Sequence, residues 1–366
     1  MTSHPALTRF QTMAAQEIAA LDPGPRVAPL DTTEWIASSM LQKAIRRNRS
    51  HVARQAGRFL LAANGNTLLR RLNAIAAEDV GLADIHTVGI AAACLARKTI
   101  RRQLGGDAVV TDYLIRRMCD ARKSRAADDL LMAIETWPDL SDDRTRFAEM
   151  SNDCLRSIVL GCPDLDRKAL ALWYLVGTRR CPSDHLTYRV VDPDQAFETL
   201  LDLGVAPTLV AIAKENFTKT QSMLAPFVAL LSLENGIVAT GVRDGQTPVE
   251  DFIGDIPSWA LDQYTRPGKH ALRRLCLEEA GMVDWLHAHV PSRSRVKVAG
   301  ELLFRVEGQC LTRRADGALS RKLRERWVSE CLSLSPDVTR SGMDALLAAI
   351  PTLNQIRQDV LTGVRS

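Results

Sequence analysis

The chain has 366 residues, of which 46% are hydrophobic, 25% are charged and only 5% are aromatic, and its formal net charge is +4. This is the composition of a globular protein with a packed core, and it favours helices over strands because alanine, leucine and arginine are plentiful. The sequence contains neither an apolar run of about 20 residues nor a signal-peptide core, so we expect a soluble, cytoplasmic protein.

Cysteine and histidine spacing gives no sign of a metal site. The eight cysteines include no C-x-x-C pair, and they are expected to be reduced thiols rather than a disulfide framework. His287 and His289 are two residues apart on a predicted helix, so their side chains point in different directions. We therefore expect no metal and no cofactor.

Basic residues are concentrated in the first part of the chain. Between residues 31 and 136 there are 17 Lys and Arg against 11 Asp and Glu, a local charge of +6 that leaves −2 for the rest. This excess is compatible with a polyanionic partner but is smaller than that of a dedicated nucleic-acid patch.

Taken in order, residues 1–30 are interpreted as a flexible N-terminal arm with a short helix over 10–20. Residues 31–136 form a predicted module of six helices with no strand signal, and the residues 31–34 resemble a capping box. The three residues 64–66 are predicted to form a turn. The expected helices of this module run over 31–47, 50–63, 68–80, 85–102, 107–119 and 126–135.

The segment 68–84 is the most informative part of this module. Leu68, Leu72 and Ile75 fall on one face of a helix, and Gly81 suits the left-handed position that ends it. Asp84 precedes the next apolar run and is expected to cap a second helix. The segment thus predicts a helix, a tight corner and a second helix.

The motif Trp137-Pro138-Asp139 is interpreted as a domain boundary, after which residues 137–366 form a second helical region packed on the first. Residues 187–191 have a brief β-like pattern, and residues 237–259 predict an irregular, ordered loop. The fold class is therefore all-α, a bundle or array of about 12–15 helices. The expected helices of this region run over 147–161, 165–176, 194–203, 207–219, 221–234, 271–280, 296–310, 320–334 and 342–360.

Three polar clusters are candidates for chemistry. In the first, Glu78, Asp79 and Asp84 could hold a divalent cation or steer a basic partner. The simpler interpretation, which we favour, is that Asp84 caps a helix while Glu78 or Asp79 pairs with Arg70, Arg71 or an arginine of another helix.

The second cluster is Arg122-Lys123-Ser124-Arg125 at a predicted helix start. Its backbone N–H groups, the Lys123 ammonium and the Ser124 hydroxyl could seat a phosphate. The alternative is a capping serine among solvated charges.

The third cluster follows the irregular loop and gathers Asp262, Tyr264, Thr265, Arg266 and Lys269 at a turn that opens a helix. Such a density of polar groups suits recognition of a phosphate or carboxylate. It also suits a buried ion-pair corner that anchors the loop. The Gly-Lys pair in this turn is not part of a P-loop, because the residue pattern around it differs.

Several of these stretches together resemble the C-terminal helical region of the RarA/MgsA family of clamp-loader-related AAA+ ATPases. More loosely, the turn 262–268 resembles an Asp-x-His-Thr-x-x-Gly element of relatives, although Tyr264 replaces the histidine. Arg122 stands where relatives have proline. The residues that carry the resemblance are Leu41–Arg47, Leu69–Leu72 with Ile75 and Ala76, Glu78–Asp84, and Lys123 and Ser124 with Ala126.

The resemblance implies a lid and oligomerisation module without the ATPase core. In the family this region assembles subunits and lies near DNA at stalled forks. Self-association and a setting in DNA metabolism are therefore expected. Nucleotide hydrolysis is not expected, because no Walker A sequence is present.

From these patterns we predict a non-catalytic module that binds nucleic acid or a DNA-processing protein. No nucleophile elbow, dinucleotide-binding glycine run or H-E-x-x-H motif points to an enzyme. The predicted phosphate contacts are Arg46, Arg47, Arg70, Arg71, Lys123, Ser124, Arg125, Arg266 and Lys269.

Two alternatives remain open. One is an enzyme acting on a phosphate-bearing substrate, with Asp262 as base and with Tyr264, Arg266 and Lys269 in the site. The other is a protein-only adaptor of a mobile element.

Overall fold

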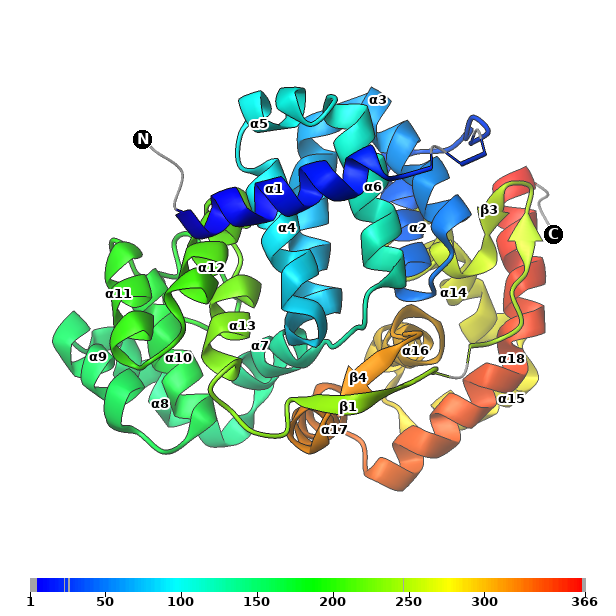
Figure 1. Cartoon of the computed structure of the whole chain (residues 1–366). Coiled ribbons are helices and arrows are strands. Elements are labelled where there is room, and N and C mark those ends of the chain that lie inside the picture. Colours follow the sequence, from blue (N-terminus) through cyan, green and yellow to red (C-terminus); the bar gives the residue numbers. More distant parts are fainter. Residues whose placement is uncertain (1–4, 23, 26, 246, 364–366) are drawn as a thin grey trace. The chain divides into compact units, whose positions relative to one another are not determined.

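The computed structural model describes residues 5–363 except 23, 26 and 246, and side chains are not described for 327–331. Helices dominate, and the strands of this described part form two sheets of two strands each (Figure 1). The predicted all-α class is confirmed. The α-helices run from α1 to α18, more than the 12–15 expected: the expected helix 85–102 is divided into α4 and α5, and α15 was not expected. Among the described residues, no helix combines the length and the apolarity that crossing a bilayer requires.

The chain folds into two compact units, each built from three separate stretches. Unit 1 comprises residues 1–23, 66–243 and 313–331, and unit 2 comprises residues 24–65, 244–312 and 332–366. These units differ from the predicted ranges 1–30, 31–136 and 137–366. Trp137 does not mark a boundary between the units, because it packs against the core of unit 1 under the Arg326 guanidinium, 3.6 Å from the ring centre.

Unit 1 contains most of the helices. A π-helical turn (Ala76–Val80) and a 3-10 turn (Gly81–Asp84) join α3 to α4. The α-helices of this unit are α1 (Pro5–Ala19), the second part of α3 (Ser50–Ile75), α4 (Ile85–Leu95), α5 (Lys98–Gln103), α6 (Asp107–Asp120), α7 (Ala126–Thr136), α8 (Ser141–Glu149), α9 (Asn152–Gly161), α10 (Leu165–Val176), α11 (Asp194–Asp202), α12 (Pro207–Thr220), α13 (Leu224–Leu231) and α17 (Ala318–Leu332).

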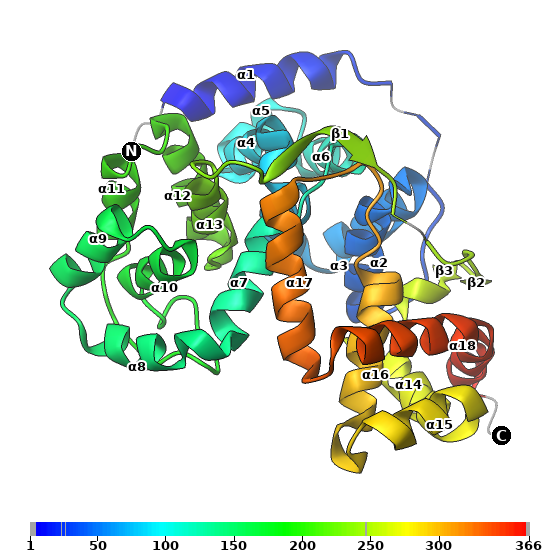
Figure 2. The same ribbon diagram turned by 90° about the horizontal axis from the view of Figure 1, so that it is seen from below.

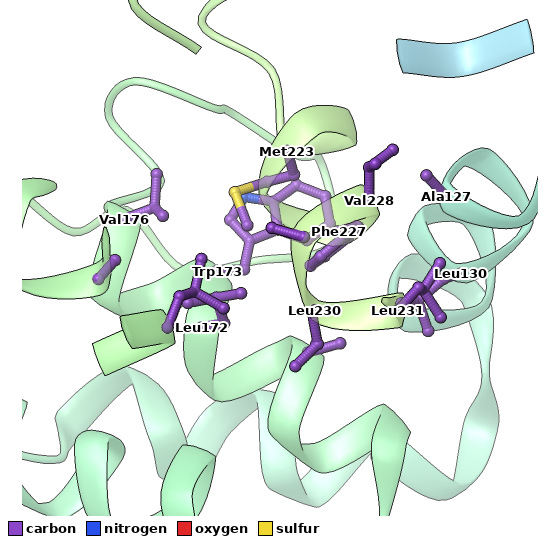
Figure 3. Packing of buried hydrophobic residues seen from close by; sticks show 14 of the residues in the cluster. Ala127, Leu130, Leu172, Trp173, Val176, Met223, Phe227, Val228, Leu230 and Leu231 are labelled. Atoms are coloured by element: carbon purple, nitrogen blue, oxygen red, sulfur yellow. The ribbon is translucent and has the colours of Figure 1, made fainter. Parts of the chain in front are cut away.

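The core of unit 1 lies where α7, α10 and α13 meet (Figure 3). Trp173 of α10 packs edge-to-face on Phe227 of α13, with ring centres 6.0 Å apart. Leu130 of α7 and Leu231 of α13 are fully buried in the same cluster. Burial of such side chains contributes about 1.5–3 kcal/mol each, which is why these helices form one body.

The N-terminal helix α1 belongs to this unit and is packed. Leu7, Phe10 and Ala14 are buried, and the Phe10 ring lies edge-on to His86 at 6.0 Å. Of the predicted arm 1–30, residues 1–4, 23 and 26 lie outside the described residues.

A small sheet completes unit 1. Strand β1 (Val238–Arg243) pairs antiparallel with β4 (Arg314–Asp316), and Lys123 forms a parallel bridge with Arg314. The Lys123 N–H donates to the Arg313 carbonyl at 3.0 Å, and the Ala315 N–H donates to the Lys123 carbonyl at 2.9 Å. The sheet thus fixes the segment before α7.

Unit 2 is organised around α14, which packs against α15, α16 and α18 (Figure 2). A short hairpin of β2 (Phe252–Ile253) and β3 (Ile256–Pro257) precedes a 3-10 turn (Ser258–Ala260), and a π-helical turn (Phe304–Gly308) extends α16. The α-helices of unit 2 are α2 (Glu34–Arg46), the first part of α3, α14 (Arg266–Glu278), α15 (Ala280–His289), α16 (Arg295–Leu303) and α18 (Pro336–Thr362).

Four local predictions differ from the structure. The cap of α2 is Thr33, whose hydroxyl accepts the Ile36 N–H, rather than Asp31. The predicted turn 64–66 is a kink within α3, where Asn64 has φ −157° and ψ 84°. The β-like run 187–191 forms no strand. The irregular stretch 237–259 does hold the short strands β1, β2 and β3.

Candidate functional site

The corner predicted at Gly81 is present in unit 1. Gly81 has φ +52°, and a Cβ at this position would lie 2.9 Å from the Ser124 carbonyl oxygen. Asp84 caps α4, because its carboxylate accepts the Thr87 N–H at 3.0 Å and the Thr87 hydroxyl at 2.7 Å. Glycine at this position therefore lets residues 122–125 approach the corner closely.

The first acidic cluster pairs with an arginine from another element. Arg125, only 2% exposed, donates to Glu78 at 2.8 Å and also to Asp79 and Asp128. Burial opposes ionisation of this guanidinium, but Asp128 and Asp79 together raise its pKa well above the ordinary value. Within the described part of the chain, no group of His, Cys, Asp and Glu side chains is placed to hold a metal ion.

The predicted phosphate seat at 122–125 is closed. Lys123 is fully buried, and its ammonium donates to the carbonyls of Cys119 at 2.6 Å and Ala121 at 3.0 Å, so it caps the C-terminal end of α6. Burial lowers the pKa of Lys123 to about 8. The Ser124 hydroxyl, also buried, accepts the Ala126 N–H at 3.4 Å.

In unit 2, the last residue of α2, Arg46, and its C-cap, Arg47, also face inward. Arg46 donates to the Gly308 carbonyl at 2.7 Å. Arg47 donates to the Glu307 carbonyl at 2.5 Å and stacks over Trp259, 4.6 Å from the ring centre. These guanidiniums satisfy the carbonyls of the π-helical turn Phe304–Gly308.

Five of the nine predicted phosphate contacts are therefore wrong as surface groups. None of them is more than 6% exposed, and a ligand cannot reach them without unfolding the unit. Arg71 is half-buried and Arg70 is exposed, both in unit 1, whereas Arg266 and Lys269 are exposed in unit 2. The five buried residues are Arg46, Arg47, Lys123, Ser124 and Arg125.

Asp262, the base of the predicted enzyme alternative, is also enclosed. Its carboxylate is 2.5 Å from the Lys43 ammonium, and its second oxygen accepts the Tyr264 N–H at 3.0 Å. Lys43 further donates to the Ser39 hydroxyl and the Trp259 carbonyl. Because both groups are buried and paired, Asp262 anchors the turn and is not available as a base.

The turn itself starts α14. The Thr265 hydroxyl accepts the Gly268 N–H at 3.2 Å, which makes Thr265 the N-cap. Gly268 allows a very close approach, since a Cβ there would lie 2.0 Å from the Asp262 carbonyl oxygen. Tyr264, directly before the cap, is 59% exposed.

The surface of α14 carries a row of exposed basic side chains that starts at the predicted residues. Arg266, Lys269, His270 and Arg273 are all exposed. Their spacing of i, i+3, i+4 and i+7 places them on one side of the helix. We call these four residues the α14 basic face.

No carboxylate among the described residues forms a salt bridge with the α14 basic face, whereas Arg274, on another side of the helix, pairs with Glu278 at 2.7 Å. The first turn of α14 contains no acidic residue and carries Arg266 and Lys269 instead. Cations at this end oppose the helix dipole, so the arrangement is not explained by helix stability. The sequence prediction missed His270 and Arg273, although their helical spacing from Arg266 was readable.

Comparison with known proteins gives no relative: no protein-family model, no curated protein and no solved structure matches the chain. The RarA/MgsA resemblance therefore stays a prediction.

Proposed function

We propose that the protein binds nucleic acid through the α14 basic face of unit 2, as a non-catalytic component of DNA metabolism. The observation that carries the proposal is the row of four exposed basic side chains with no carboxylate partner in the described structure. Arg266 and Lys269 keep their predicted role, and His270 and Arg273 take the place of the five buried residues. Self-association and a DNA-processing protein partner rest only on the resemblance.

The chemistry of the face suits phosphates rather than bases. Arginine and lysine on one helical side contact backbone oxygens, which positions the nucleic acid without reading its sequence. The three permanently charged side chains of the α14 basic face should release about three counterions from the nucleic acid on binding. The logarithm of the affinity should then fall with the logarithm of the salt concentration with a slope of about −2 to −3.

A titration of the full-length protein into a fluorescein-labelled oligonucleotide, read by fluorescence anisotropy at 50 and 200 mM salt, tests the proposal. In the variant Arg266→Ala/Lys269→Ala/Arg273→Ala, we expect affinity at 50 mM salt to fall at least about tenfold and the salt slope to approach zero. The replaced side chains are on the solvent side of α14, so the circular dichroism spectrum should not change.

A charge-matched control is available on α5 of unit 1. Arg97, Lys98 and Arg102 are exposed, and Arg97→Ala/Lys98→Ala/Arg102→Ala removes the same net charge. This control should bind nearly as tightly as the wild type. Equal loss in both variants, or wild-type binding that is indifferent to salt, would contradict a site on α14.

A further inference from the structure

We infer that the ligand of the α14 basic face is single-stranded nucleic acid, with Tyr264 as the surface on which an unpaired base stacks. This inference rests on the proposed function and specifies its ligand. Tyr264 precedes the N-cap of α14 by one residue, stands two residues before Arg266, the first residue of the α14 basic face, and is 59% exposed. An exposed aromatic ring beside phosphate-binding side chains is the combination that binds single strands.

The position of Tyr264 is fixed by contacts on its inner side. Its N–H is held by the Asp262 carboxylate at 3.0 Å, and Asp262 is in turn held by Lys43. The Tyr264 ring meets the Phe304 ring edge-to-face, with centres 6.1 Å apart and planes at 90°. Phe304 is itself covered by the Arg46 guanidinium, 5.7 Å from its ring centre.

The buried ion pair of Lys43 and Asp262 therefore has a role beyond the stability of the fold. Lys43 and Asp262 hold the turn, the turn holds the exposed ring, and Thr265 then starts the helix that carries the cations. A stacking side chain that is already ordered loses little conformational entropy when a base docks. The structure therefore prepares Tyr264 for contact with a flat, apolar partner.

Geometry favours a single strand over a duplex. Bases in a duplex are stacked on one another, and their faces are not accessible to a side chain, whereas unpaired bases can stack on an aromatic ring. From Arg266 to Arg273 the helix rises about 10 Å, a length of about three stacked nucleotides. A short, sequence-tolerant footprint is expected from such a surface.

The test compares four fluorescein-labelled probes of equal length: oligo-dT, oligo-rU, the corresponding duplex, and a strand of abasic sites. The wild type should bind oligo-dT or oligo-rU more tightly than the duplex or the abasic strand. The difference between the first two probes distinguishes DNA from RNA. Tyr264→Ala should weaken binding of the preferred single strand at least about fivefold and leave binding of the abasic strand unchanged.

Tyr264→Phe is the matched variant, because it keeps the ring and removes only the hydroxyl. It should bind the single strand as the wild type does. If Tyr264→Ala has no effect, or if the duplex and the abasic strand bind as well as the single strand, the inference on the ligand fails. Binding that still depends on Arg266, Lys269 and Arg273 would then leave the proposed function standing, whereas the loss of that dependence would remove both.

Discussion

At the scale of single residues, the protein uses many of its arginines to neutralise its own interior. Arg357 is completely buried, donates to both oxygens of Glu307 at 2.7 and 3.2 Å, and holds the Leu261 carbonyl at 3.0 Å. Arg125 joins three carboxylates in the same way. A planar guanidinium can serve several acceptors at once, and a lysine ammonium cannot reproduce that geometry. Counting charged residues along the sequence therefore overestimates the positive charge on the surface of the protein.

Arg125→Met tests this interpretation. The change removes the guanidinium that Asp79, which has no solvent exposure, accepts a hydrogen bond from, so we expect the free energy of unfolding of unit 1 to fall by about 3–5 kcal/mol. The measurement is a urea titration that follows the fluorine NMR signal of Trp173 in the 5-fluorotryptophan-labelled protein. Arg125→Lys should recover only part of the loss.

The surface pair of Arg156 and Asp202 provides the control. The two side chains are 39% and 47% exposed, so Arg156→Met should change the free energy of unfolding by less than about 1 kcal/mol. If Arg125→Met lowered the free energy of unfolding as little as Arg156→Met, the buried cluster around Arg125 would not be what stabilises the corner.

At the scale of elements, the corner between α3 and α4 depends on a backbone conformation that only glycine adopts easily. Gly81→Ala brings a Cβ to 2.9 Å from the Ser124 carbonyl and places alanine at φ +52°. We expect a loss of about 1–3 kcal/mol of stability and a lower melting temperature, measured by calorimetry.

Gly161→Ala is the contrasting variant. Gly161 ends α9, its φ is not positive, and a methyl group added to its Cα would meet no atom within 4 Å. Alanine there should be neutral or stabilising by up to about 1 kcal/mol. The two variants should shift the melting temperature in different ways. Similar shifts would refute the claim that the conformation of Gly81 matters.

The same corner shows what a sequence can predict about this fold. Leu68 and Leu72 repeat at a helical spacing, and Gly81 and Asp84 act on the residues next to them in the chain, so these local patterns were sufficient to predict a helix, a turn and a cap. Arg125 was assigned to a surface because its partners, Glu78 and Asp79, lie 47 and 46 residues away. The choice between a solvated and an enclosed arginine depends on tertiary contacts, which periodicity does not contain.

At the scale of the whole molecule, the division into units escaped prediction for the same reason. Each unit assembles three stretches, and residues 313–331 join unit 1 through β4, whose backbone pairs with β1 and with Lys123. A strand of three residues has no readable pattern in the sequence. Only half of the exposed site was predicted. Arg266 and Lys269 were recognised, but the α14 basic face as a whole was not.

The two units should respond differently to alkaline pH, because they enclose different numbers of thiols. In unit 1, burial raises the pKa of Cys94, Cys119 and Cys181 to about 12, while burial lowers the pKa of Lys123 to about 8. In unit 2, burial raises the pKa of Cys276 to about 11 and lowers the pKa of Lys43 to about 8.

The signs are opposite for the two residue types. Between pH 9 and 11 a buried thiol keeps a proton that the unfolded chain has lost, so each thiol makes stability fall as pH rises. Between pH 8 and 10.5 a buried amine has lost a proton that the unfolded chain keeps, so each lysine makes stability rise. Unit 1, with three thiols against one lysine, should lose about 3 kcal/mol per pH unit near pH 10. In unit 2, where Cys276 and Cys310 are both buried, the pKa shifts of Cys276 and Lys43 oppose each other, so the loss should be smaller.

Fluorine NMR of the 5-fluorotryptophan-labelled protein can follow the units separately, through Trp173 in unit 1 and Trp259 in unit 2. In urea titrations under reducing conditions, the midpoint reported by Trp173 should fall between pH 8.5 and 10, while that reported by Trp259 should fall less. Replacing Cys94, Cys119 and Cys181 by alanine should abolish the fall, because over this pH range Lys123 outweighs Tyr113 and Tyr174, whose pKa values burial raises. A parallel decline of both signals would mean that the buried thiols do not set the alkaline limit of unit 1.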